Sequence, residues 1–337
     1  MKYAGIDLHS NNCVVSVIDE ADRVCAERRV SNVLADVLMV LQPHHAELKG
    51  VVVESTFNWY WLVDGLQEAG HVVHLANTAA MQPYSGLKHG DDRSDARHLA
   101  HLLRLGILPT GFIYPRQQRA ARDLARHRMR LVQTRSRAII AVENVLSCHT
   151  GGRLSSNQIK RLGGDDIEGL QLHADVRLAL HAQIALIGAL DAQIGALERR
   201  LQERVRLQPG YRTLLTVPGI GAVLATVIAL ETGPIERFGA AGDFASYARC
   251  VGSTLLSNGK KKGTGNVKNG NRYLAWAFVE AAQFARRYSD QAKRFYDRKR
   301  AQTNTAVATK ALAHKLARAC YHMLKQNASF DAARCFG

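Results

Sequence analysis

The sequence predicts an α/β domain at the N-terminus, an α-helical coiled-coil region in the middle and a mostly α-helical domain at the C-terminus. Three strand candidates open the chain at residues 2–9, 13–19 and 23–30, the first of them an apolar run that carries one carboxylate, and helical and strand patterns then alternate. This succession is typical of an α/β sheet of mixed direction. Farther along, the helical period dominates, first in two long stretches and then in several shorter ones.

The length allows two or three domains with cores of their own. The chain has 337 residues, and 47% of them are hydrophobic, which favours a globular protein. We expect three regions, at residues 1–115, 116–207 and 208–337.

Basic residues outnumber acidic ones in the chain as a whole. Lys and Arg number 45 against 29 Asp and Glu, which gives a formal charge of +16. A surplus of this size suits a polyanionic partner, either nucleic acid or an anionic membrane surface. Because neither end carries a basic amphipathic helix with bulky aromatic residues, nucleic acid is favoured and no membrane contact is expected.

The sequence also predicts a cytosolic protein. The N-terminus has no apolar signal run, and the longest apolar segment, residues 214–230, is interrupted by Pro218 and two glycines. The six cysteines show no zinc-type or disulfide-type spacing, so they are expected to be reduced.

Four acids are candidates for a metal site. Asp7 lies in the first strand, Glu54 ends the strand predicted at residues 48–53, and Asp92 and Asp95 share a face at a helix start. Each has an alternative role in a turn or a helix cap, and Asp91 competes with Asp92 in register. Clustered carboxylates repel one another, and a divalent cation relieves the repulsion. Together the four could hold Mg²⁺ or Mn²⁺.

Residues 116–137 are rich in arginine. Eight arginines accompany a single acid, Asp123. Arginine favours bidentate contact with phosphates, so we expect Arg122, Arg126 and Arg130 to bind nucleic acid. The alternative is a solvated helix face.

The arginine-rich stretch begins the first of two long helices, which continues to about residue 146, and a loop at residues 150–166 that is rich in Gly, Ser and Asp joins it to the second. Apolar residues between 180 and 201 recur at spacings of three and four, which predicts a coiled-coil seam. The pair should form either an antiparallel hairpin or a dimerising arm.

A Pro-Gly-x-Gly turn follows at residues 218–221 and leads into a helix. Such a turn leaves backbone N–H groups free to meet a phosphate, so Gly219 and Gly221 are candidates for backbone contact with nucleic acid, as in a helix-hairpin-helix turn. A tight turn between helices is the alternative.

Residues 252–272 are predicted to be a flexible loop of Gly, Lys and Asn before a helix. Ser257 lies within it and could be a nucleophile toward phosphorus, although no local base would activate it, and a turn serine is the alternative. Between residues 260 and 300, twelve Lys or Arg residues accompany three acids, which predicts a phosphate-binding surface. The members singled out in and beside the loop are Lys260, Lys261, Lys262, Lys268 and Arg272.

Five ordered motifs together resemble one family across nearly the whole chain. They are Gly5-Ile6-Asp7, Glu54, Asp92-Arg93-Ser94-Asp95-Ala96, Val217-Pro218-Gly219-Ile220-Gly221, and Ser257-Asn258-Gly259-Lys260 with Asn269-Gly270-Asn271. This set resembles the insertion-sequence-110 family of transposases, also called DEDD transposases. The resemblance implies a RuvC-like, RNase H-type N-terminal domain, a coiled-coil middle and a C-terminal transposase domain.

The resemblance also implies an activity and its residues. Asp7, Glu54, Asp92 and Asp95 match the four family acids, and Ser257 is matched to the catalytic serine. The implied reaction is DNA recombination through a phosphoserine, with target and donor DNA chosen by a structured bridge RNA. Dimers that pair into a tetramer, in the cytoplasm and at the nucleoid of a bacterium or archaeon, are implied as well.

The serine assignment has a competitor. Many family members carry a proline shortly after the glycine that matches Gly252, and their serine often precedes a glycine. Here that proline is missing and Asn258 follows Ser257. Ser253 is therefore the second candidate nucleophile.

Three other functions compete with recombination. A RuvC-like endonuclease would cut branched DNA with a metal-activated water and leave Ser257 structural. An actin-like ATPase or sugar kinase also opens on a Gly-Ile-Asp strand, but its second phosphate loop and adenosine loop are missing from the sequence. A non-enzymatic RNA-binding protein would explain the arginines and not the four acids.

Overall fold

The computed structural model describes residues 1–81, 91–206, 208–252, 254–264 and 269–336. The chain divides into two compact units. One comprises Met1–Arg116 with Leu255–Asn269, and the other comprises Gln117–Thr254 with Gly270–Gly337. The prediction of three regions stays a prediction.

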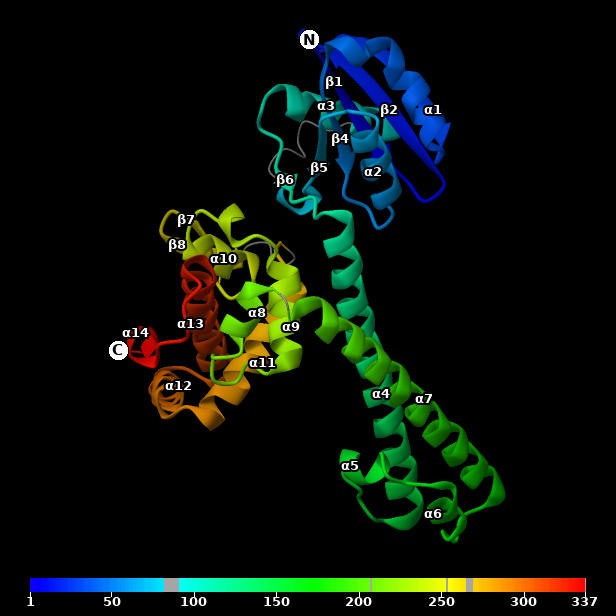
Figure 1. The fold of residues 1–337 in the computed structure, drawn as a ribbon, viewed down its shortest axis with the longest axis vertical. Helices are drawn as coiled ribbons and strands as arrows, with labels where there is room; N and C mark the ends of the chain where they lie inside the picture. Colours follow the sequence, from blue (N-terminus) through cyan, green and yellow to red (C-terminus); the bar gives the residue numbers. More distant parts are fainter. Residues whose placement is uncertain (82–90, 207, 253, 265–268, 337) are drawn as a thin grey trace. The chain divides into compact units, whose positions relative to one another are not determined.

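A six-stranded sheet forms the centre of the first unit (Figure 1). Its strands run in the order β3-β2-β1-β4-β5-β6; β1 pairs parallel with β4 and β4 with β5, and the other pairs are antiparallel. The mixed α/β architecture predicted for the N-terminal region is thus confirmed. The strands are β1 Lys2–Leu8, β2 Asn12–Asp19, β3 Val24–Ser31, β4 Leu48–Glu54, β5 Val73–Ala76 and β6 Thr110–Gly111.

Helices cover both faces of this sheet. Helices α1 (Leu34–Leu41) and α2 (Tyr60–Glu68) pack with the alternate apolar residues of β1, β2 and β4. Helix α3 (Asp92–Arg104) covers the opposite face, where Gly5 allows its close approach. A Cβ at Gly5 would lie 2.0 Å from the carbonyl oxygen of Ala96, so a side chain there would push α3 away.

Two long helices of the second unit form an antiparallel hairpin. They are α4 (Arg116–Thr150) and α7 (Ala174–Val205). Arg128 pairs with Glu198 and Arg135 pairs with Asp191, so the two helices run in opposite directions. The hairpin alternative of the sequence analysis is confirmed, whereas supercoiling of the pair stays a prediction.

The far end of the hairpin is closed by two short helices where composition predicts a loop. These are α5 (Ser156–Ile159) and α6 (Gly164–Glu168). Ile159 and Ile167 are buried there against α4 and α7, and this apolar contact explains why the connection is ordered.

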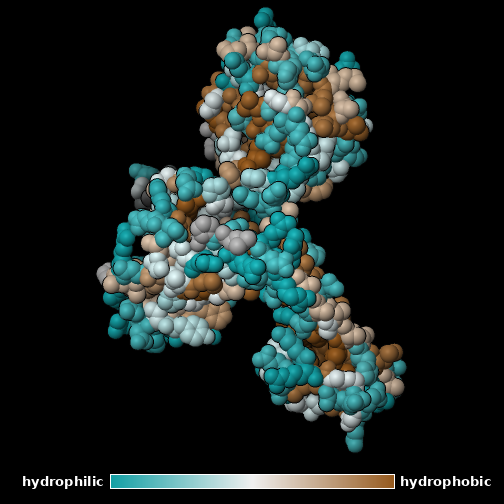
Figure 2. Space-filling view, viewed as in Figure 1, coloured by the Kyte–Doolittle hydropathy of each residue, from teal (hydrophilic) through white to brown (hydrophobic). Residues whose placement is uncertain are grey.

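Hydrophobic side chains also lie on the surface of the hairpin (Figure 2). Leu178 is 71% exposed and Ile140 is 54% exposed. Among the described helices, only α7 is long and apolar enough to cross a membrane by length and composition. Its ion pairs with α4 show that it packs against α4 in the hairpin.

The rest of the second unit is a helical bundle around a core that includes Phe244 and Phe278, both fully buried. At Gly219, φ is +90°, and a Cβ there would lie 2.4 Å from the backbone nitrogen of Ala285 in α11. The glycine therefore permits a close helix contact. The helices are α8 Pro209–Leu214, α9 Ala222–Thr232, α10 Ala241–Tyr247, α11 Arg272–Tyr288, α12 Asp290–Gln302, α13 Thr305–Gln326 and α14 Ala332–Phe336.

The segment predicted as a flexible loop contains a β-hairpin instead. Strands β7 (Thr254–Ser257) and β8 (Lys260–Thr264) pair with each other. Asn258 and Gly259 connect them with φ values of 50° and 71°. Positive φ at both central residues is the requirement of a type I′ turn, and Asn-Gly is its preferred sequence. The loop prediction is wrong because the Asn258-Gly259 turn favours two paired strands over an open loop.

Candidate metal centre and serine hairpin

Asp7 lies near the carboxyl end of β1, on the sheet face that α3 covers. Side chains alternate along a strand, so Asp7 shares the face of Gly5, which contacts α3. Glu54 shares this face too, because Gly5 pairs with Val52 and each acid lies two residues farther along its strand. Across β2, the register aligns Arg29 with Asp7. Three strands therefore deliver charged side chains to one edge.

The start of α3 settles which of two adjacent aspartates faces this edge. Asp91 is the N-cap of α3, where its carboxylate accepts a hydrogen bond from the Ser94 N–H at 2.6 Å. Asp92 instead accepts a hydrogen bond from Arg29 Nη2 at 2.5 Å. That hydrogen bond is the main reason why the pKa of Asp92 is lowered. The capping role thus belongs to Asp91, and Asp92 is available at the sheet edge.

His9 joins the two aspartates. Its Nε2 lies 3.3 Å from Asp7 Oδ2 and 3.3 Å from Asp92 Oδ2. Each of the three residues offers one possible ligand atom, and these atoms lie within 4.8 Å of one another. Asp7 is only 2% exposed, which makes its negative charge costly without a neutralising partner.

The donor set fits a divalent cation. Asp7 Oδ2 and His9 Nε2 are buried atoms that have no hydrogen-bond partner among the described residues. Carboxylate oxygens are the ligands that Mg²⁺ and Mn²⁺ take in proteins, and an imidazole nitrogen favours transition metals. A cation between these atoms would satisfy both orphaned groups at once.

Two asparagines hold His9 in place. Its carbonyl oxygen accepts hydrogen bonds from Asn32 Nδ2 at 3.0 Å and from Asn58 Nδ2 at 2.9 Å. Asn58 in turn accepts a hydrogen bond from the Thr56 hydroxyl at 2.9 Å, in the segment that follows β4. His9, Asn32 and Asn58 were not predicted from the sequence. A histidine two residues after a strand aspartate was the available signal for His9.

Glu54 and Asp95 lie at the same end of the sheet but not in the tight group. Among described residues, that group contains Asp7, His9 and Asp92 only. Glu54 ends β4, and Asp95 lies one turn along α3 from Asp92. Both are partly buried and engaged in interactions within the protein. Their role as metal ligands stays a prediction.

The three predicted nucleic-acid arginines of α4 differ in their surroundings. Arg126 forms a two-point ion pair with Glu231, with Nε–Oε1 and Nη2–Oε2 distances of 2.6 and 2.8 Å. Arg122 is only 7% exposed, whereas Arg130 is exposed. Of the three, the geometry leaves Arg130 accessible to a nucleic-acid phosphate. Contact through Arg122 or Arg126 has no support from their placement.

The buried pair of Arg126 extends to the end of the serine segment. Asn271 Nδ2 donates to Glu231 Oε2 at 2.7 Å, and Asn271 Oδ1 caps α11 by accepting from the N–H groups of Tyr273 and Leu274. Glu231 is 1% exposed. The network fixes the backbone immediately after residues 254–269.

Ser257 is exposed at the end of β7, directly before the Asn258-Gly259 turn. Lys260 follows that turn and is exposed as well. The described hairpin, residues 254–264, contains no acid or histidine that could act as a local base. The hydroxyl is therefore accessible beside a cation but needs activation from elsewhere.

The remaining predicted binding residues are distributed over several elements. Lys262 is exposed on β8, and Arg272 is exposed at the start of α11, where it donates to the Tyr273 hydroxyl at 3.0 Å. Gly221 is the N-cap of α9 and has open space around its Cα. Lys268, Ser253 and the side chain of Lys261 lie outside the described residues.

Comparison with known proteins gives two family matches and several relatives. Residues 4–149 match a model described as a transposase of the DEDD IS110 type, and residues 211–297 match one described as the transposase IS116/IS110/IS902 family. A probable family 20 transposase of Pseudomonas aeruginosa is 24% identical over 97% of both chains. The transposase for insertion sequence element IS1328 of Yersinia enterocolitica is 25% identical over 97% of this chain and 98% of its own.

Both family matches include residues of the candidate metal centre or of the serine hairpin and its anchor. The first contains the Asp7–His9–Asp92 group with Glu54 and Asp95, and the second contains Ser257 and the Glu231–Asn271 pair. The two full-length relatives extend the similarity across almost the entire chain. The chain belongs to the IS110 family of transposases, enzymes that cut and rejoin DNA.

Proposed function

We propose that this transposase recombines DNA through a phosphoserine on Ser257, and that Asp7, His9 and Asp92, with Glu54 and Asp95 beside them, hold the divalent cation that the reaction uses. The observation that carries the proposal is the convergence of Asp7, His9 and Asp92 within 4.8 Å at one sheet edge. The exposed Ser257 beside Lys260 supports the choice of nucleophile.

In this proposal the acids bind the cation and the lysines of the serine hairpin bind the DNA strand. A bound Mg²⁺ or Mn²⁺ would neutralise charge on the scissile phosphate. Asp7 is buried at the end of a rigid strand, and Arg29 holds Asp92 ionised, so both carboxylates are oriented before substrate arrives. Lys260 and Lys262 would hold the phosphates of the strand around Ser257.

The covalent chemistry conserves the number of phosphodiester bonds. The Ser257 oxygen bonds to phosphorus, the bond between phosphorus and one DNA oxygen breaks, and that oxygen leaves as a hydroxyl with the proton that serine gave up. A hydroxyl of the second DNA then attacks the phosphoserine, and Ser257 regains its proton. Because the bond energy is kept in the ester, the scheme needs no ATP.

Partner choice is the second part of the proposal. The family resemblance supports selection of target and donor DNA by a structured bridge RNA, and dimers that pair into a tetramer. The charge of +16 and the exposed cations such as Arg130 are consistent with an RNA partner as well as DNA. An electrophoretic mobility assay with the transcribed flank of the element, against a scrambled RNA of equal length, tests the RNA partner.

Substitution of the acids tests the metal centre. Asp7→Asn, Glu54→Gln, Asp92→Asn and Asp95→Asn should each abolish recombination of a donor–target plasmid pair while far-UV circular dichroism stays that of the wild type. The capping aspartate offers a matched control, because Asp91→Asn should recombine normally. Wild-type recombination by Asp92→Asn would contradict the assignment.

The serine variants separate the proposal from its rival. Ser257→Ala should bind DNA and RNA normally but yield no covalent protein–DNA band on a denaturing gel, whereas Ser253→Ala should keep the band. If Ser257→Ala still cut DNA with no band in any protein, a RuvC-like endonuclease that uses water would be the better assignment.

A further inference from the structure

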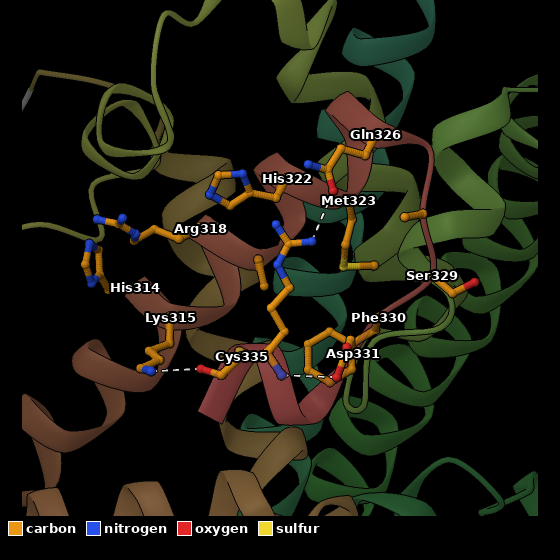
Figure 3. A pocket seen from close by; sticks show the side chains of 13 residues that line it. His314, Lys315, Arg318, His322, Met323, Gln326, Ser329, Phe330, Asp331 and Cys335 are labelled. Atoms are coloured by element: carbon orange, nitrogen blue, oxygen red, sulfur yellow. Dashed lines mark hydrogen bonds between the residues drawn. The ribbon is translucent and has the colours of Figure 1, made fainter. Parts of the chain in front are cut away.

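A pocket of about 500 Å³ lies between α13 and the C-terminal segment with α14. All of its lining residues follow residue 297, where the second family match ends. Figure 3 shows His314, Arg318 and His322 along one wall and Phe330 with Asp331 on the other side. The three wall residues are four positions apart on α13, which places them on one helix face.

The pocket is strongly basic. Lys315, Arg318 and Arg334 line it together with two histidines, and Asp331 is its single acid. Lys315 Nζ donates to the Cys335 carbonyl at 2.8 Å, and Asp331 accepts from the Arg334 N–H at 3.1 Å. Arg318 is exposed and has no hydrogen-bond or ion-pair partner in the described part of the chain. Its guanidinium is therefore available to an anion.

The surroundings of His314 have the same positive character. Burial lowers the pKa of His314, and the charges of Arg318 and Lys315 lower it further. Two cations close enough to disfavour a third positive charge would favour a negative one in the same place.

The floor of the pocket is apolar. Met323 is 6% exposed, and Phe330 packs against the core of the bundle while lining the pocket. Ala319 adds a small side chain beside them. A cationic rim over an apolar and aromatic floor matches the two parts of a nucleotide, a charged phosphate and a flat base.

We propose that this pocket binds one unpaired nucleotide of a nucleic-acid strand, with its phosphate on Arg318 and His314 and its base against Met323 and Phe330. The volume suits a nucleotide, since ligand pockets of this size bury groups as large as a base with its sugar. A base held in a duplex could not reach the floor, so the site selects single-stranded or flipped-out residues.

Fluorescence anisotropy with labelled twelve-nucleotide oligouridine and oligothymidine tests the proposal, with a duplex of equal length as the comparison. The full chain carries Ser257→Ala and is measured in EDTA, so the result does not depend on phosphoserine chemistry or on the cation. The variants are Arg318→Gln and Phe330→Leu. The control is Arg23→Gln, since Arg23 is 80% exposed and lies in the other unit.

Phe330→Leu should weaken single-strand binding by about 5- to 150-fold, the range for loss of one base stack, and leave duplex binding unchanged. Arg318→Gln should reduce the salt slope of single-strand binding by about 0.7, the value for one phosphate contact. Arg23→Gln should change neither the affinity for the single strand nor the salt slope. Circular dichroism checks that each variant is folded.

Three results would overturn the proposal. Equal weakening of single-strand and duplex binding by Phe330→Leu, or no weakening at all, would exclude a bound base. Binding of uridine monophosphate as tight as that of the oligonucleotide would make the ligand a free nucleotide. Displacement of the oligonucleotide by hexaglutamate at equal concentration would assign the pocket to an acidic protein segment.

Discussion

Removal of one partner from the buried pair between Arg126 and Glu231 should strongly destabilise the helical unit. Glu231 is 1% exposed and accepts hydrogen bonds from Arg126 and from Asn271. In Glu231→Gln the charge is lost while the size is kept, so Arg126 is left as a cation without its counter-ion. Loss of one partner of a buried pair costs about 3–5 kcal/mol.

The exposure of Arg126 selects the lower end of this range. Its side chain is 26% exposed, so water screens part of the uncompensated charge. We therefore expect Glu231→Gln to lower the free energy of unfolding by about 3 kcal/mol, a large fraction of the 5–15 kcal/mol typical of a protein. With a urea dependence of about 1–3 kcal/mol per molar, the midpoint should fall by about 1–3 M.

Urea unfolding followed by helical circular dichroism measures this loss. Glu236→Gln is the matched control, since Glu236 is exposed on a neighbouring turn and should change stability by less than about 0.5 kcal/mol. The double variant Arg126→Met/Glu231→Leu should be more stable than the sum of its single variants predicts, because no charge is left unpaired. A loss below about 1 kcal/mol for Glu231→Gln, or strict additivity in the double variant, would show that Arg126 does not depend on Glu231 as its counter-ion.

Three further predictions concern the sheet unit. Gly5→Ala should destabilise the protein by about 1–3 kcal/mol or more in thermal unfolding, because its Cβ would lie 2.0 Å from the Ala96 oxygen. An unfolding midpoint equal to that of the wild type would show that α3 can shift to make room for the methyl group. Asp91→Ala should lower the midpoint by a few degrees at neutral pH. The hydrogen bond from the Ser94 N–H lowers the pKa of Asp91 in the folded protein. The cap therefore stabilises the fold at pH values above the pKa of Asp91 in the unfolded chain, and this stabilisation is lost as the pH falls through the lowered pKa of the folded protein. The difference in midpoint between Asp91→Ala and the wild type should accordingly shrink in acid. Mn²⁺ should raise the wild-type midpoint and leave that of Asp7→Asn unchanged, and an equal rise in both would place the ion elsewhere.

The sheet and the position of its acids follow from patterns that the sequence displays. Alternating apolar residues set the strands, and strand order brings Asp7 and Glu54 to one edge because their strands are parallel neighbours. The ambiguity between Asp91 and Asp92 could not be resolved in this way. A helix cap depends on backbone geometry at one residue, and the structure shows that Asp91 fills that position.

Other features depend on contacts between distant segments. Arg126 belongs to an arginine-rich stretch that resembles a phosphate-binding surface, but its partner Glu231 is 105 residues away. The anchoring of His9 by Asn32 and Asn58 likewise comes from separate loops. The β7–β8 hairpin does not depend on distant contacts, since its Asn258-Gly259 turn is a local signal. The segment around this turn is rich in Gly and Lys, and that composition is typical of a loop.

Identification of the residue that becomes covalently linked to DNA is the most direct test of the proposed phosphoserine mechanism. Wild-type protein is incubated with Mg²⁺ and a nicked donor site, denatured, treated with nuclease and protease, and analysed by tandem mass spectrometry. We predict a peptide with a nucleotide phosphate on Ser257 that is absent from reactions with EDTA and from Asp7→Asn. The same adduct on Ser253, or cleaved DNA with no modified serine in any peptide, would exclude Ser257 as the nucleophile.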